Sequence, residues 1–463
     1  MATGRLGSKT IFTTQSIRGE SDYEMSLSIG TIRGWVRDHG PTGFVRRIHH
    51  VIGLRDADGV RYRNDVGQPV LESQAMSPDL FSFRALAVGL FGEENMEEAL
   101  SRPGLLNARP YERLEGNVLE ADGGAIVPSQ FANISAYNET VAGLLEAKIL
   151  EAYKRPEFMA DRMMMTIPSN KRQEKFIGIS TPADVAQIRN PGASHPAMDL
   201  RERFVTTALT QNYGLKVDVT REAVMFDLTR ELLQQSELVG RTLALRKENR
   251  MWRMVLGVDN SYTYNGTGYA TYVASAGNWT NWYQNPLTDY TALDAVWQAF
   301  FGMTDQETGQ PIAVDAKDLF VMQGIYATAS HILRQTTVEL RTPNPATSNG
   351  YATVVGAGAS PVKFTNDWEL VGKPSPYAFS AATASDGLAM SASNAKGIWL
   401  AGNFKKAFGY VENMPLTTLR ANPDSYTMAD KGLVFSLFGD EMGVPCVLEP
   451  RYVIKCQPQA TGS

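Results

Sequence analysis

The residue types that most often hold metal ions are few in this chain of 463 residues, and they are not clustered. It has five histidines and two cysteines. His49 and His50 are adjacent and could begin a metal site, but Cys446 and Cys456 lack the spacing with which cysteines ligate zinc. We therefore interpret the two histidines as ordinary polar residues and predict neither a metal nor a cofactor.

The sequence also lacks a pattern for nucleophilic catalysis or phosphate binding. Ser360 follows several glycines but does not lie in the Gly-x-Ser-x-Gly turn of a hydrolase. Gly266 and Gly268 lack the lysine that follows the glycines of a phosphate loop. Three aspartates have no visible partner and fit solvated faces: Asp294, Asp315 and Asp318. A cytoplasmic hydrolase is thus a remote alternative, because it needs a nucleophile, a base and an orienting group together.

The composition is that of a globular protein with a substantial core, at 43% hydrophobic and 20% charged residues. Lysine and arginine number 44 against 49 acids, a net charge of −5, which excludes binding to nucleic acid through bulk positive charge. Two cysteines indicate a reducing compartment. The N-terminus lacks a signal-peptide pattern, and no apolar run approaches the roughly 18 residues of a membrane span. We expect a soluble chain made in the cytoplasm, with no membrane partner.

The strongest pattern along the chain predicts one long helix over about residues 220–257. Its apolar residues recur at spacings of three, four or multiples of these, as one face of a helix requires: Met225, Leu228, Leu232, Val239, Leu243, Trp252 and Val255. Thr220 or Asp227 can cap its start, and Gly257 can end it. A helix of this length leaves one face for neighbouring elements or molecules.

Two strands joined by a long, charged, proline-containing loop precede this helix, at about residues 175–180 and 204–217. A two-stranded arm with so little apolar content is not stable alone, so it needs another surface to lie on. Further helices are predicted at 78–101, 136–154, 287–301 and 326–335, and further strands at 318–323, 368–371, 397–401, 407–411, 433–438 and 444–456. Residues 258–281 have the composition of a loop, and 341–360 that of a loop or hairpin. Together these elements indicate a mixed α+β fold.

In their order along the chain, the predicted elements and short motifs resemble those of the major capsid proteins of tailed phages, which have the Hong Kong 97 type of fold. The run from Gly123 to Pro128 is similar to the Gly-Gly-x-x-Val-Pro that opens the ordered domain of many members. The charged arm at about 170–217 resembles their extended E-loop. The long helix with its Leu-Gly ending at Gly257 resembles their spine helix. The stretch 317–335 is similar to the strand and helix of their A-domain, and the segment around Gly402 and Phe404 to their returning strand.

The resemblance covers about residues 121–457 and implies a division of the chain. The implied parts are an N-terminal extension (1–120), an N-arm and entry helix (121–168), the E-loop (169–219), the P-domain spine helix and loop (220–284), the A-domain (285–400), and a return to the P-domain with a C-terminal tail (401–463). The first 120 residues match no part of the mature shell. They are a scaffolding segment removed by a protease, a retained domain or a long N-arm. Their turn-rich sequence and aromatic residues (Trp35, Phe44, Tyr62) favour a folded piece that is retained.

The resemblance implies a non-enzymatic major capsid protein of a virion. It would assemble in the host cytoplasm, as pentamers and hexamers, into an icosahedral shell around double-stranded DNA. The implied partners are other copies of the chain, a portal protein, a scaffold or maturation protease, and the packaged DNA, bound non-specifically. An encapsulin-type compartment shell is the alternative with the same fold, and the length of the chain counts against it.

Residues 241–253, in the second half of the long helix, carry five basic residues against one acid, Glu248: Arg241, Arg246, Lys247, Arg250 and Arg253. This stripe either faces packaged DNA or the acidic rim of a neighbour, or forms a solvated face with local salt bridges. Some relatives cross-link an E-loop lysine to an asparagine of a neighbouring P-domain. Lys171 and Lys175 lie in the corresponding region, with Asn403 and Asn413 as candidate partners, by fold analogy alone.

Overall fold

The computed structural model describes residues 29–52, 77–93, 96, 128–155, 157–177, 204–259, 262–274, 280–305, 309–334, 341–343, 351–353, 368–421 and 431–458. The chain divides into two compact units, each built from several stretches of sequence. The first comprises Met1–Arg155, Tyr213–Ala244 and Leu416–Glu441, and the second Pro156–Asn212, Leu245–Pro415 and Met442–Ser463. The boundary cuts four long elements: helix α8 (Thr229–Val255) and strands β4 (Gln211–Thr220), β13 (Phe408–Ala421) and β14 (Leu433–Val447).

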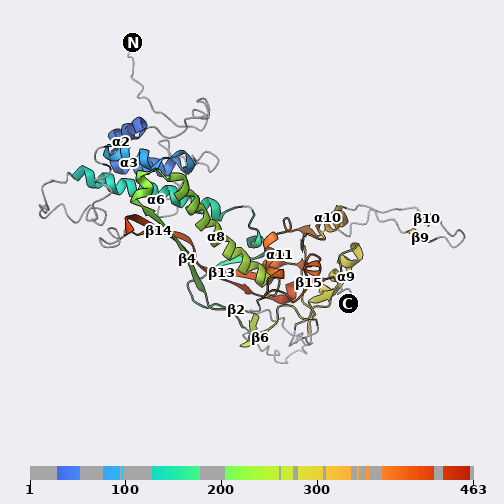
Figure 1. Ribbon diagram of the computed structural model, residues 1–463. Coiled ribbons are helices and arrows are strands. Elements are labelled where there is room, and N and C mark those ends of the chain that lie inside the picture. Colours follow the sequence, from blue (N-terminus) through green and yellow to red (C-terminus); the bar gives the residue numbers. More distant parts are fainter. Residues whose placement is uncertain are drawn as a thin grey trace, which may run out of the picture. The chain divides into compact units, whose positions relative to one another are not determined.

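The first unit is mainly helical. Its helices are α2 (Ile29–Val51, kinked at Gly40), α3 (Phe83–Phe91), α6 (Pro128–Tyr153), α7 (Arg221–Met225) and the first part of α8. In Figure 1, α2 and α3 (blue) lie beside α6 (teal). Apolar side chains from all of these helices and from β14 form one core, in which Phe44, Phe83 and Tyr137 are fully buried.

Two of these helices differ in extent from the sequence prediction. Over its described residues, the helix predicted at 78–101 begins with a short 3-10 turn (η2, Pro78–Leu80) followed by α3, which ends at Phe91 because Gly92 adopts a positive φ of 83°. Met96 is again helical, and residues 94, 95 and 97–101 lie outside the described part. Helix α6 begins at Pro128, eight residues before the predicted start, since proline is well suited to a first helical turn. Residues 53–76 and 97–120 of the predicted N-terminal extension, and the Gly-Gly motif before Pro128, lie outside the described residues.

The single helix predicted over 220–257 is wrong at its start. Thr220 caps the short helix α7, where its Oγ1 accepts a hydrogen bond from Ala223 N (3.2 Å). The helix is then interrupted at Asp227, whose φ is +53°, and a new helix, α8, begins at Thr229. Its predicted end is confirmed, because Gly257 has a φ of +71° directly after the last turn.

A four-stranded sheet has the order β1-β13-β14-β4. Strand β1 (Met165–Pro168) pairs in parallel with β13, with Met165 opposite Gly409. Strand β13 is much longer than the predicted strand at 407–411. The strand predicted at 444–456 is interrupted: β14 ends at Val447, a 3-10 turn (η4, Pro450–Tyr452) follows, and β15 begins at Val453.

The second unit is built around a five-stranded sheet of order β11-β8-β12-β15-β7. Its strands are β7 (Trp282–Gln284), β8 (Asp318–Val321), β11 (Glu369–Leu370), β12 (Trp399–Gly402) and β15 (Val453–Gln457). Alternate residues of β8 point to opposite faces, so Leu319 and Val321 join one core and Phe320 another. Both faces of β8 are therefore covered, which explains why the sequence predicted a buried apolar strand there.

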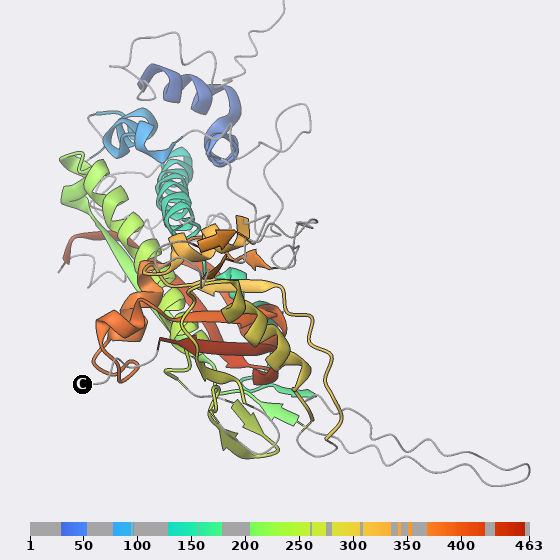
Figure 2. The same cartoon turned by 90° about the vertical axis from the view of Figure 1, so that its right-hand side faces the viewer.

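Helices cover both faces of this sheet. Helices α9 (Tyr290–Phe301) and α10 (Tyr326–Arg334) contribute to the core on one face. Figure 2 shows α9, in olive yellow, lying across the orange and red strands. The last turns of α8 and helix α11 (Pro376–Thr383) contribute to the core on the other face, where the Trp252 ring lies 4.6 Å from that of Phe320.

A second four-stranded sheet, of order β2-β3-β5-β6, contains the roots of the predicted arm. Strands β2 (Lys175–Ile177) and β3 (Phe204–Thr206) are antiparallel, and the residues between them lie outside the described part. The predicted strand at 204–217 is in fact two strands, β3 and β4. The prediction of a loop at 258–281 is also wrong, because β5 (Tyr262–Tyr264) and β6 (Thr267–Tyr269) form a hairpin there.

The remaining elements are short. Strands β9 (Arg341–Pro343) and β10 (Tyr351–Thr353) form an antiparallel pair, which confirms a hairpin in the region 341–360. Helices α2 and α11 and two short helices, α12 (Ala392–Ala395) and α13 (Phe404–Ala407), were not predicted. Over the described ranges, no helix combines the length and apolar character needed to cross a membrane.

Candidate assembly surface

The two segments on either side of the predicted arm, residues 169–177 and 204–210, are joined by backbone hydrogen bonds. Thr207 N donates to Glu174 O and Thr210 N donates to Arg172 O, both at 3.0 Å. Ser169 N donates to Glu412 O at 3.0 Å, which ties the first of these segments to β13. The arm thus starts from a rigid base within the second unit.

The side chain of Asn413 links these three segments. Its Nδ2 donates to the carbonyl oxygens of Ser169 (3.0 Å) and Lys171 (2.7 Å) in the first segment, between β1 and β2. Its Oδ1 accepts a hydrogen bond from Thr210 Oγ1 (2.8 Å) in the second segment, between β3 and β4. The amide therefore uses both N–H groups and its oxygen at the base of the arm.

The root of the arm has one buried and one exposed face. Val205 is 1% exposed and belongs to the core of the second unit. On the other face, Ile177 and Phe204 lie opposite each other across the two strands, and they are 86% and 36% exposed. Leu209, just beyond β3, is 53% exposed. Apolar side chains placed in this way on a strand pair provide a surface that another protein could cover.

Two other groups of large apolar side chains are exposed. On α9 of the second unit, the rings of Trp297 and Phe301 make an edge-to-face contact with 4.6 Å between centroids. In the first unit, Phe226 and Leu238 are 73% and 62% exposed.

The four cross-link candidates lie in different environments. Lys171 and Lys175 are exposed at the root of the arm, and Lys171 forms a salt bridge of 3.5 Å with Glu174. Asn403 is the N-cap of α13, where its Oδ1 accepts from Lys406 N. Asn413 is hydrogen-bonded as described above. The inter-subunit cross-link stays a prediction.

Three of the five basic residues predicted as a stripe make contacts inside the second unit. Lys247 is only 11% exposed, with its Nζ 3.7 Å from Glu412 Oε1 and 4.5 Å from the centroid of the Tyr410 ring. Arg250 donates to Gly443 O at 3.1 Å. These contacts match the interpretation of local pairing more closely than that of a free basic stripe.

Arg253 is the most strongly paired member of this set. Its guanidinium donates two hydrogen bonds of 2.8 Å to Asp259 and lies 3.0 Å from a carboxylate oxygen of Asp386. These acids raise the pKa of Arg253 above its ordinary value. Arg241 and Arg246 are exposed, on the parts of α8 that belong to the first and second unit respectively. Contact with packaged DNA stays a prediction for all five residues.

Glu248, the acid within the basic stripe, is a buried structural group that the sequence analysis treated only as a charge. Its carboxylate accepts hydrogen bonds from the backbone N–H groups of Met159 and Ala160 (3.0–3.1 Å) and from the indole of Trp252 (2.6 Å). Burial raises the pKa of Glu248, and these donors oppose the shift. Glu248 therefore links Met159 and Ala160, which belong to the core of the second unit, to helix α8.

The end of α8 is closed by groups that are distant in sequence. Lys455 Nζ donates to Leu256 O at 2.7 Å, and the Tyr272 hydroxyl donates to Val255 O. Lys455 is 3% exposed, and burial lowers its pKa to about 7. A Cβ on Gly257 would lie 2.6 Å from the Tyr272 ring, so glycine is required by the packing as well as by φ.

A buried ion cluster lies next to η4. Arg451 donates to both carboxylate oxygens of Glu449 (2.6 and 2.8 Å) and to Asp305 Oδ1 (3.2 Å), and all three residues are at most 4% exposed. Nearby, the Asn281 side chain donates to Thr271 O and Pro450 O, both at 2.9 Å. Sequence reasoning missed these groups because their partners are up to about 170 residues apart in the chain.

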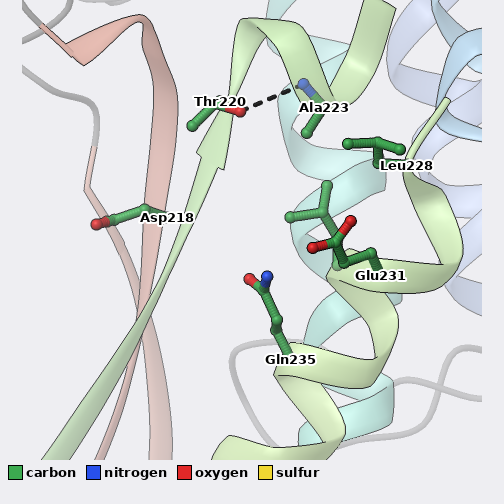
Figure 3. A pocket seen from close by; sticks show the side chains of 7 residues that line it. Asp218, Thr220, Ala223, Leu228, Glu231 and Gln235 are labelled. Atoms are coloured by element: carbon green, nitrogen blue, oxygen red, sulfur yellow. Dashed lines mark hydrogen bonds between the residues drawn. The ribbon is translucent and has the colours of Figure 1, made fainter. Parts of the chain in front are cut away.

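The hollow drawn in Figure 3 lies in the first unit, between β4, α7 and the start of α8. Two carboxylates line it, Asp218 and Glu231. Burial opposes ionisation of Asp218, but hydrogen bonds from Lys216 and Ser436 outweigh it and lower the pKa of Asp218.

The residues considered for chemistry do not form a reactive site. His49 lies 3.3 Å from Glu139 O, and burial lowers its pKa. Cys446 and Cys456 are buried free thiols. Within the described ranges, no three metal-binding side chains are placed to hold an ion.

The three aspartates predicted to lie on solvated faces have partners, and Asp315 is exposed whereas Asp294 and Asp318 are half-buried. Asp294 accepts from Gln298 (2.7 Å), Asp315 pairs with Lys317 (3.4 Å), and Asp318 accepts from Phe404 N (3.4 Å).

Comparison with known proteins supplies the family. The family model described as "phage capsid protein" matches residues 204–455, more than half of the chain. A comparison with curated proteins finds no match. Among solved structures, the capsid of a native GTA particle is similar (11% identity, 66% of this chain and 91% of that chain, TM-score 0.38).

Two other solved structures illustrate the same range of similarity. The capsid of the cyanophage P-SCSP1u shares 16% identity over 64% of this chain and 85% of that chain, with a TM-score of 0.35. A virus-like particle from Pyrococcus furiosus shares 9% over 67% and 97%, with a TM-score of 0.34. All three TM-scores are below 0.5, so the assignment depends on the match to the sequence family. On that match, the chain belongs to the phage capsid protein family and is a structural, non-enzymatic component of the virion.

Proposed function

We propose that this capsid protein is the major shell subunit of a tailed phage, which assembles as pentamers and hexamers into an icosahedral shell around double-stranded DNA. The observation that best supports the proposal is the arm of the second unit. Its base is fixed by Asn413, and its root presents Ile177 and Phe204 to the outside. A subunit that worked alone would gain nothing from an exposed apolar strand pair.

A fixed base with an extended arm suits the construction of a shell. The arm of one subunit would lie over its neighbour, so that the contact gains area without thickening the wall. Specific protein interfaces bury about 1,600 Å², and closed assemblies arise when the same contact is repeated with rotational symmetry. The apolar face at Ile177 and Phe204 would form part of that contact.

The proposal extends to the residues that the sequence analysis selected. Arg241 and Arg246 are exposed and are the members of the basic set best placed to contact packaged DNA or a neighbour. Lys171 and Lys175 are exposed near the proposed subunit contact, where a cross-link would form if one exists in this phage. A portal protein, and a scaffold or maturation protease, would be further partners of such a shell.

The proposed contact can be tested by placing a charge in it. In the Ile177→Asp variant, a carboxylate would be buried against the neighbour, so we expect sedimentation velocity to show loss of the assembled species at an unchanged melting temperature. Thr267→Asp, on strand β6 of the same sheet, is the matched control and should assemble like the wild type. Normal assembly of Ile177→Asp would contradict this role of the arm.

A further inference from the structure

The N-terminus of helix α3 forms hydrogen bonds with residues at the junction between α7 and α8. Phe83 N donates to Thr229 Oγ1 at 2.9 Å, and Arg84 N lies 3.5 Å from Asp227 Oδ1. Ser82 Oγ donates to Asp227 Oδ2 at 2.9 Å, and Thr229 Oγ1 donates to Asp227 Oδ1 at 2.6 Å. Two residues from the long-helix region thus satisfy N–H groups that the first turn of α3 leaves unpaired.

This contact explains why the helix predicted over 220–257 is broken. Asp227 has a φ of +53°, which is disfavoured for a residue with a side chain. In an unbroken helix, its carboxylate and the Thr229 hydroxyl would not be presented together to α3. The contact with α3 therefore compensates for the local conformation.

Helix α3 and the residues near it in sequence also contribute to the core of the first unit. We use "N-terminal helical segment" for residues 29–93, described at 29–52 and 77–93. The core of the first unit contains 26 buried residues; eleven of them come from this segment, and Met96 is a twelfth. They cover the apolar face of α6, including Tyr137, Val141 and Leu144, each 0% exposed. Lys148 of α6 also pairs with Asp79 at 2.8 Å.

We propose that the N-terminal helical segment is a permanent part of the folded subunit, held by Asp227 and Thr229, and is not a removable scaffold. Its loss would expose the face of α6 to water and leave the two capping side chains without the helix they cap. A scaffold that is removed from a finished shell needs the opposite design, a contact that can be lost without exposing the core. This inference concerns the single subunit and does not depend on shell assembly.

Limited proteolysis of the full-length chain tests the proposal. After digestion with thermolysin, the products are separated by size-exclusion chromatography under native conditions and identified by mass spectrometry. We expect peptides from residues 29–93 to co-elute with the fragments of residues 128–458, or to remain uncut. The proposal is overturned if the segment is degraded or elutes separately while the remainder keeps its melting temperature.

A variant pair tests the capping contact itself. Thr229→Val keeps the shape of the side chain but removes the oxygen that accepts from Phe83 N, so we expect the rate of cleavage within residues 77–93 to rise about five- to thirty-fold. Thr242→Val, at an exposed position of α8, is the matched control and should be cleaved at the wild-type rate. Equal rates in all three proteins would show that the junction does not hold the segment.

Discussion

Lys455 is an unusual residue for the interior of a protein, because its amine is buried and its nearest described partners are uncharged. It donates to Leu256 O at 2.7 Å and lies 5.2 Å from the centroid of the Tyr272 ring. Burial without a carboxylate destabilises the charged form, which lowers its pKa to about 7. The same amine also satisfies a carbonyl at the end of α8, which gives it a structural role.

The depressed pKa of Lys455 predicts a pH-dependent stability. Between the folded pKa of about 7 and the unfolded value of about 10.4, the unfolded chain binds one more proton than the folded chain. Raising the pH from 7 to about 9.5 should therefore increase the free energy of unfolding, by at most about 1.4 kcal/mol per pH unit.

Replacement of this lysine isolates its contribution. Lys455→Met should reduce the slope of stability against pH, measured by urea unfolding between pH 7 and about 9.5. Lys373→Met, an exposed lysine of the second unit, should keep the wild-type slope. If Lys455→Met and the wild type have the same slope, the amine is charged in the folded protein and the assigned pKa is wrong.

The conformation and packing of Gly257 lead to a second prediction, on the stability of the folded protein. Alanine there must adopt a φ of +71° and place its Cβ against the Tyr272 ring. We expect Gly257→Ala to lower the free energy of unfolding by about 2 kcal/mol. Gly268→Ala, where no atom lies within 4 Å of the new Cβ, should change it by less than about 1 kcal/mol. Thermal denaturation measures both losses of stability, and equal losses in the two variants would contradict the prediction for Gly257.

Single residues explain why the candidate site could be predicted only in part. The basic residues of α8 are evident in the sequence, and Asp259, which pairs with Arg253, is only six residues away, but the other acids that pair with Lys247 and Arg253 are Glu412 and Asp386, more than 130 residues away. Only the fold brings them together. Glu248 had a local signal, because Trp252 follows it by one helical turn, but its backbone donors at Met159 and Ala160 could not be inferred.

At the scale of elements, the base of the arm depends on one side chain. In Asn413→Asp the two N–H donors disappear, and a carboxylate faces the carbonyl oxygens of Ser169 and Lys171. We expect a loss of about 1–3 kcal/mol in the stability of the arm's base, seen as faster hydrogen exchange at Thr207 N and Thr210 N.

A matched change separates this effect from added charge alone. Asn212→Asp makes the same substitution at an exposed position of β4 and should leave those exchange rates unchanged. Unchanged exchange at Thr207 and Thr210 in Asn413→Asp would show that the backbone hydrogen bonds alone hold the base.

Elements with a strong local pattern were predicted well, and their interruptions were not. The end of α8 before Gly257 and the strands β8 and β12 follow from the positions of glycine and of apolar runs, whereas the strands predicted at 433–438 and 444–456 are divided differently, into β14 and β15. The break at Asp227 results from a tertiary contact with α3, which no local pattern contains. The hairpin β5–β6 did have a signal, since Asn265 and Gly266 both have the positive φ of a type I′ turn, and Asn-Gly between alternating residues is typical of it.

For the whole molecule, the resemblance to phage capsid proteins is confirmed by the family match over residues 204–455. The division of the chain into an extension, E-loop, P-domain and A-domain stays a prediction. The structure instead separates two units, each of which is built from three separate stretches of the sequence. Sequence order alone could not predict this, because α8 and three strands continue from one unit into the other.

Electron microscopy of the purified full-length chain, expressed alone, tests the central claim most directly. A shell subunit is expected to form closed particles or rings of five or six copies, because the contacts that build the shell are between copies of the same chain. Particles of uniform diameter, or such rings, are the predicted result. A chain that stays monomeric at high concentration, with its fold intact, would contradict the assignment of a self-assembling shell subunit.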